Sequence, residues 1–387
     1  MEAERLHSVL SAVALDAARF NIPNLLAQVE ATFTQSLASP NQATSTAFEA
    51  ALQALRDYPP QSECSRLSPS KQRILEAIGG AHIFGGLAER VTAILEQNRT
   101  TLASTVPALQ RLRTEAEKFI QAAQAIRSGF GTLNIREDEA PIDQCEVGIV
   151  LPSELVQGNL EGFEKELKKF DRALKTFTEL MTGNTASAEI RSIGTGTLDV
   201  FVSLDPISAA ALLLAVERIV AIYKGVLESR KLHRELKEKE APAKILDELT
   251  KWERTRVLED LTKLREELIE RRAINEKKRT DEEFKTLLLN SLKTLADRID
   301  RGADVEVSAP EPTEGEGEEA AGEEPTEGRP EPNERRREAL AYVRQKGAIV
   351  RSIERQPEPV LCIDSGTSED AEDGETEAKG KVRGKTK

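Results

Sequence analysis

Aromatic side chains are scarce in this sequence of 387 residues. Phe, Trp and Tyr together make up 4% of the chain, and there is one tryptophan, Trp252. Large rings fill much of the core of thick sandwiches and barrels, so this scarcity argues against such folds. Ala, Leu, Glu, Lys and Arg dominate instead, a composition that favours long helices. We therefore expect a mainly α fold that contains a small α+β module.

Cysteine and histidine are also rare, with three residues of each. Cys64, Cys145 and Cys362 lie far apart and no CxxC pair exists, which argues against a disulfide framework and a thiolate zinc site. No histidine lies at metal-ligand spacing from another histidine or from a cysteine. A reducing compartment is the simplest interpretation, so we expect a cytoplasmic protein without a metal or another cofactor.

Neither a secretory signal nor a membrane span is expected from the sequence. The N-terminal residues are acidic and amphipathic, and they lack the basic start and apolar block of a signal. One apolar run, 207–216, is followed closely by Glu217, Arg218 and Lys224. A span needs about 20 apolar residues, and charges at mid-depth are costly, so a helix buried against a sheet is the better interpretation.

The net charge of −13 is concentrated in two acidic segments. These lie within 303–332 and 366–387, and the second ends in a short basic tail. Such segments bury too little apolar surface to offset the entropy of ordering, so we predict that both are disordered. The acidity therefore says little about a binding face of the folded part.

Residues 1–134 have the pattern of helices only. In the segment 100–127, apolar residues alternate steps of three and four, which is the period of about 3.5 residues typical of a coiled-coil seam. Its positions are Leu102, Thr105, Leu109, Leu112, Ala116, Phe119, Ala123 and Ile126. The repeat is short, so it fits packing within one chain as well as packing between two chains.

Residues 145–236 alternate between strand and helix patterns. Residues 145–151 and 198–204 alternate apolar and polar side chains, and 189–193 precedes the latter across a glycine-containing link. Helix patterns cover 159–181 and the residues after the last strand. We predict a three-stranded β-α-β-β-α unit of two layers, in which the last two strands form a hairpin. The pattern leaves the strand order open.

Residues 237–302 have the pattern of further long helices, at least partly in a coiled coil or helical hairpin. The apolar positions of the first helix, surrounded by Glu and Arg, are Ile245, Leu249, Trp252, Leu261, Leu264 and Leu268. Residues 333–365 begin with a short helix, and the runs 348–353 and 359–363 could be strands.

Catalytic motifs are not apparent in the sequence. There is no GxSxG or HExxH, and the Gly194–Thr197 cluster lacks the lysine and the following helix of a phosphate loop, so a hairpin turn explains it better. Asp205 is explained as a helix cap and Asp199 as the exposed side of a strand. Basic clusters lie close to many acids without interleaved aromatic residues, which makes a nucleic-acid site the weaker interpretation. We do not expect an enzyme.

The remaining functional signal is the set of narrow apolar seams, each of which needs a second helix. We hypothesise a scaffold or adaptor that acts through helical contacts with other proteins or with itself. The candidate seam residues are Leu102, Leu109, Leu112, Phe119, Ile126, Leu261, Leu264 and Leu268. One rival is a ligand- or peptide-sensing regulatory module built on 145–236, and another is a nucleic-acid-associated protein using its basic segments.

Overall fold

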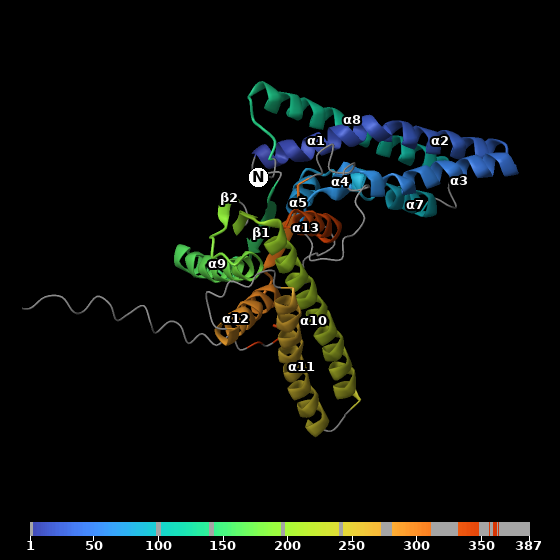
Figure 1. Cartoon of the computed structure of the whole chain (residues 1–387). Coiled ribbons are helices and arrows are strands. Elements are labelled where there is room, and N and C mark those ends of the chain that lie inside the picture. Colours follow the sequence, from blue (N-terminus) through green and yellow to red (C-terminus); the bar gives the residue numbers. More distant parts are fainter. Residues whose placement is uncertain are drawn as a thin grey trace, which may run out of the picture.

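The computed structural model shows a mainly helical protein with one small antiparallel sheet (Figure 1), which confirms the predicted class. The described residues are 3–97, 102–138, 143–194, 198–239, 243–271, 281–310, 332–347, 356, 359–361 and 363.

The described residues up to 132 form helices that are joined by short turns. They are α1 (Ala3–Phe20), α2 (Ile22–Ala38), α3 (Gln42–Asp57), a 3-10 turn (Pro59–Gln61), α4 (Glu63–Arg66), α5 (Pro69–Ala77), α6 (Ala81–Phe84), α7 (Leu87–Gln97) and α8 (Leu102–Thr132). Asn21 separates α1 from α2 with a left-handed φ of 45°, and Pro23 then lies in the first turn of α2, where proline is tolerated. α8 packs along α1 and α2, and these helices share a core of their own.

The sheet has four strands in the order β2-β3-β1-β4, all antiparallel. They are β1 (Cys145–Leu151), β2 (Glu189–Ile193), β3 (Leu198–Leu204) and β4 (Asp304–Ser308). β2 and β3 pair as the predicted hairpin requires. The prediction of three strands is wrong, because residues assigned to the acidic linker form β4 and pair with β1. Val305 and Val307 are buried there, so their packing outweighs the acidic composition around them.

Different parts of the chain cover the two faces of the sheet. On one face, α9 (Leu160–Thr182), α10 (Pro206–Glu238) and α12 (Asp281–Asp300) share an apolar core with strand residues such as Val147 and Ile149. On the other face, Arg5 of α1 donates to Glu146 of β1. The two helices predicted for this unit, α9 and α10, lie on one face of the sheet, and polar side chains on the second face hold the N-terminal helices against it as a further layer.

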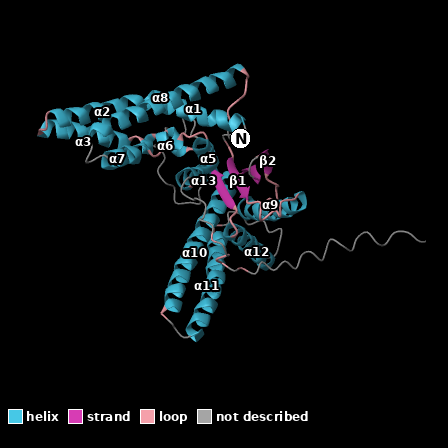
Figure 2. Cartoon of the chain, turned by 180° about the vertical axis from the view of Figure 1, so that it is seen from behind, coloured by secondary structure: helices cyan, strands magenta, loops and turns pink. Residues whose placement is uncertain are grey.

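α10 and α11 (Ala243–Glu270) form a long helical hairpin, which we call the arm. It projects away from the sheet, as both views show (Figures 1 and 2). α10 has 33 residues, which corresponds to about 50 Å at the usual helical rise. Near the sheet the arm packs on α9, α12 and α13 (Pro332–Lys346). Farther out, the two helices have mainly each other to pack against.

A short C-terminal segment returns to the core. The backbone N–H groups of Val360 and Leu361 each donate to the Asp300 carboxylate at 2.7 Å, and both side chains are buried. The described residues of the run 359–363 do not form the predicted strand, because a side chain and not a neighbouring strand accepts these N–H groups. The other predicted strand, 348–353, lies outside the described residues.

Candidate functional site

The predicted seam of α8 is largely buried inside the chain. Leu109 and Leu112 are fully buried, and Phe119 is partly buried with its ring 6.1 Å from that of Phe84. They belong to the core that α8 shares with α1 and α2. Leu102 begins α8, but its side chain lies outside the described part. The central seam residues of α8 therefore pack against helices of the same chain.

Ile126, the last predicted seam position, is not enclosed by helices of the same chain, because its side chain is 48% exposed. The predicted seam continues from Ala116 to Phe119, a step of three residues. The next buried position is instead Ile120, a step of four, and Ala123 follows it. A straight helix has about 3.6 residues per turn and drifts away from a strict seven-residue repeat. The buried face of α8 follows that drift, and Ile126 rotates into solvent.

The second predicted seam, on α11, is also buried within the chain. Leu261, Leu264 and Leu268 share a core with side chains of α10 and α12. Each of the three is nearly inaccessible to solvent. These residues hold the arm together, and Leu264 also borders a groove on its surface.

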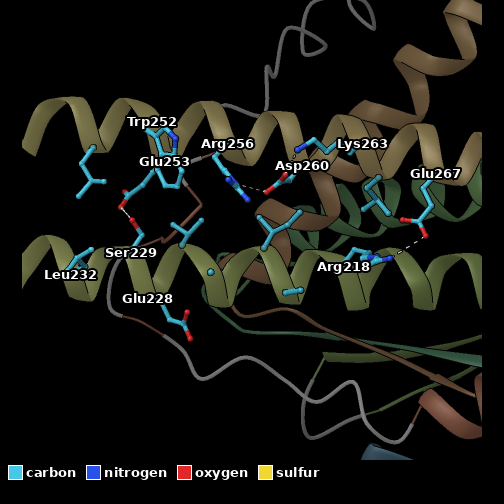
Figure 3. Close-up of a pocket in the computed structure, with 16 residues that line it drawn as sticks. Arg218, Glu228, Ser229, Leu232, Trp252, Glu253, Arg256, Asp260, Lys263 and Glu267 are labelled. Atoms are coloured by element: carbon cyan, nitrogen blue, oxygen red, sulfur yellow. Dashed lines mark hydrogen bonds and ion pairs between the residues drawn. The ribbon is translucent and has the colours of Figure 1, made fainter.

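An open groove runs beside this buried seam, between α10 and α11 (Figure 3). Its volume is about 870 Å³, and its lining is mostly apolar. α10 contributes residues from Arg218 to Leu232, and α11 contributes residues from Leu249 to Glu267. In both helices the lining positions recur every three or four residues, so each helix presents one continuous stripe.

Small residues make the α10 side of the groove shallow. Ala221 and Gly225 line its middle, and a Cβ atom added at Gly225 would meet nothing within 4 Å. Glycine in a helix interior costs about 0.5–1 kcal/mol relative to alanine. Glycine at position 225 therefore makes α10 less stable than alanine would, and it leaves room for a side chain of a bound partner.

Trp252 stands on the α11 side of the groove and is 53% exposed. Trp252 and Ile245 belong to the predicted apolar positions of this helix, and both side chains are exposed. The guanidinium of Arg256 lies over the Trp252 ring, 5.5 Å from its centre. Sequence reasoning missed this pair, although a single tryptophan four residues before an arginine, among charged neighbours, was an available signal.

The polar residues along the groove are paired mainly with one another. Ser229 Oγ donates to Glu253 at 2.6 Å, Arg218 lies 3.4 Å from Glu267, and Arg256 and Lys263 lie 3.4 and 3.2 Å from Asp260. Arg218, Arg256 and Lys263 are exposed, and ion pairs with an exposed partner contribute little to stability, whereas Glu253 is buried. The groove can therefore attract an apolar surface and orient it by its charged rim.

A second concentration of charge lies between the N-terminal helices and the polar face of the sheet. Arg5 and Arg191 both donate to Glu146, at 2.9 and 2.5 Å, and Arg191 also donates to Asp138 at 3.0 Å. Arg5 also lies 3.3 Å from the ring centre of Phe201. Opposite charges are matched throughout, as expected of buried ions that hold two layers together.

Two groups at this joint have shifted pKa values. Burial lowers the pKa of Lys71, although Asp138 nearby opposes the shift. Burial raises the pKa of Glu306, while Arg73 at 2.5 Å and the Ser70 N–H at 2.9 Å oppose that shift. Both directions follow from the cost of removing a charge from water. The cluster has partners within the protein and serves as a structural joint.

The thiols have little nucleophilic character. Burial raises the pKa of Cys145 to about 12 and also raises the pKa of Cys64, so neither forms a thiolate near neutral pH. Cys362 lies outside the described residues. Within the part of the chain that is described, no group of three or more His, Cys, Asp or Glu residues could hold a metal ion.

The remaining sequence candidates have structural explanations or lie outside the described residues. The Asp205 carboxylate accepts from the N–H and the hydroxyl of Ser208, both at 2.9 Å, so it caps α10 as predicted. The His7 ring forms a 2.7 Å hydrogen bond with the carbonyl of Ile135. Residues 195–197 of the predicted hairpin turn and the basic cluster 277–279 lie outside the described residues.

α10 is the described helix that is long and apolar enough, by composition, to cross a membrane. The share of its most apolar window that is buried inside the protein is 61%. Comparisons with protein-family models, curated proteins and solved structures gave no match.

Proposed function

We propose that this protein is a cytoplasmic scaffold or adaptor whose arm binds an amphipathic helix in the groove between α10 and α11. The observation that carries the proposal is the groove itself, with Trp252 exposed at one side and Gly225 open at the other. The proposal assigns no reaction and no cofactor to the chain.

The shape of the site favours a helix as the bound element. Two packed helices present two rows of side chains with a depression between them. A third helix fits this depression when its apolar side chains recur every three or four residues and so form one face. The bound helix would extend the packing begun by the seam of α11, in the manner of a coiled coil.

The residue types favour a protein partner over a small molecule. Tryptophan and arginine are the side chains most often responsible for binding energy at protein interfaces, and here Arg256 lies over Trp252. A half-exposed indole is also costly to leave in water, because burying apolar area yields about 25 cal/mol per Å². Trp252 is therefore expected to supply much of the affinity.

Site-specific cross-linking in the native host tests the proposal. A photoreactive amino acid replaces Ala221 on the groove floor of the full chain, and in the matched control it replaces Lys224, which is exposed on α10 outside the groove. We expect adducts at 221 that map by mass spectrometry to the apolar face of a helix, and few at 224. Equal adducts at the two positions, or none at 221, would contradict the proposal.

A further inference from the structure

We propose that the groove binds the groove of a second copy of this chain, so that two arms pack antiparallel as a four-helix bundle. This inference rests on the proposed function, because it names the helix that the arm binds. Three features of the arm lead to it, namely its two-helix form, the shape of its groove and the distribution of charge along it.

The arm supplies half of a common architecture. Four-helix bundles are built from antiparallel helices around a shared apolar core, and two hairpins are sufficient to make one. α10 and α11 each present an open stripe on the same side of the hairpin. A second hairpin with two stripes of its own covers both, whereas a single helix leaves part of one stripe exposed.

The groove is complementary in shape to itself. Trp252 lies toward the tip of the arm (Figures 1 and 3), while Ala221 lies near the middle of α10, about one turn closer than Gly225 to the end of that helix that packs on the sheet. A two-fold axis through the middle of the groove places the tip of each arm on the base of the other. The bulky indole of one copy then lies over the small residues of the other, as a self-complementary isologous interface requires.

Charge along the groove supports the same antiparallel arrangement. The half near the tip is lined by Glu228, Glu253 and Arg256, and the half near the sheet by Arg218, Lys263 and Glu267, with Asp260 between them. The first half therefore has an excess of one acid and the second an excess of one base. Antiparallel pairing brings the acids of each copy toward the bases of the other. Parallel pairing would bring like charges together, and that arrangement is disfavoured at interfaces.

Sedimentation of the purified full chain across a concentration series tests the inference. We expect a mass of two chains that falls to one on dilution. Gly225→Leu fills the groove without a clash inside the monomer, so it should weaken association at least about tenfold, while the thermal midpoint of the dilute monomer stays equal or rises. Gly129→Leu is the matched control, because Gly129 lies in α8 with the same open space around its Cβ position.

A charge exchange then tests the antiparallel orientation. Glu228→Lys and Lys263→Glu should each weaken the dimer, and the double variant should recover most of the loss, because the acid and the base exchange places in both copies. A dimer that Gly225→Leu leaves intact would place the interface elsewhere and overturn the inference. So would a double variant that is weaker than both single variants.

The failure of this inference is distinguishable from failure of the proposed function. A chain that sediments as a monomer at every concentration overturns self-pairing of the arms. If the Ala221 position nevertheless cross-links to a helix of another protein, the proposed adaptor function stands. If the protein is monomeric and the groove forms no adducts above the Lys224 control, both are wrong.

Discussion

The N-terminal helices and the arm use similar apolar stripes with different outcomes. In the N-terminal region, α8 lies along α1 and α2, and its central seam residues are enclosed by the same chain. In the arm, α11 buries Leu261, Leu264 and Leu268 but leaves Trp252 and the groove beside them open. A stripe on one helix therefore does not by itself indicate an interface, because neighbouring helices decide whether it is closed.

The comparison also separates residues that stabilise the fold from residues available for binding. Leu109 and Leu261 have the same role in their two cores, as buried contacts between helices. The arm has an open apolar groove beside its buried leucines. Beside the buried residues of α8 the exposed apolar side chain is Ile126, which stands alone. The difference between stabilising and available residues can be tested by comparing a substitution at a buried position with one at an exposed position of the same helix.

The largest effect is expected for Leu109→Glu combined with Leu112→Glu. Both positions are fully buried, and a carboxylate there would be desolvated without a partner, so we expect a loss of more than about 4 kcal/mol in the free energy of unfolding. Urea denaturation followed by circular dichroism measures it. Ile126→Glu on the same helix is the control, with an expected change within about 0.5 kcal/mol. If Ile126→Glu lowered the free energy of unfolding as much as the double substitution, the assignment of buried and exposed positions on α8 would be wrong.

A smaller loss is expected in the arm from Leu261→Ala. Truncation of a fully buried leucine costs about 2–5 kcal/mol through lost burial and the remaining cavity. Leu258→Ala, three residues earlier and exposed, should cost under about 1 kcal/mol. Thermal and urea unfolding of both variants give the comparison. If Leu258→Ala is as destabilising as Leu261→Ala, the face of α11 that holds the arm together has been wrongly assigned.

The joint between the N-terminal helices and the sheet should respond to pH through Glu306. Because burial raises its pKa above the usual value of about 4.5, its protonated form favours folding. Its contribution is present below that pH and is lost as the pH rises through the raised pKa. The free energy of unfolding of the native chain, relative to Glu306→Gln, should therefore fall over this window.

Unfolding by urea at a series of pH values measures this dependence. The exposed Glu161→Gln variant should run parallel to the native chain at each pH above about 5. A difference between the native chain and Glu306→Gln that stays constant with pH would show that Glu306 titrates normally at the joint.

The smallest expected effect is a gain in stability from Gly225→Ala. The added methyl meets nothing within 4 Å, and alanine is favoured over glycine in a helix interior by about 0.5–1 kcal/mol. Thermal unfolding at low protein concentration measures it without a contribution from association. A loss of stability would show that the groove floor is closed in solution, and the contrast between the arm and the N-terminal helices would disappear.

Local patterns in the sequence predicted several elements correctly. The alternation in 198–204 indicated a strand, the helix after Asp205 is capped by that residue, and the hairpin between β2 and β3 forms. These features depend on side chains that are close in the sequence. β4 was missed because its alternating valines stand within an acidic segment, and its pairing with β1 joins residues about 160 positions apart.

The sequence by itself determined which side chains lie on the apolar face of each helix, since the helical period fixes that for any chain of this composition. Only the tertiary structure decided which faces are covered. It left Trp252 open and enclosed Leu264 on the same helix, and it placed the acid Glu306 beside Arg73 of a helix more than 200 residues earlier. The physical reason is that burial depends on neighbours brought together by the fold, and a local pattern does not contain them.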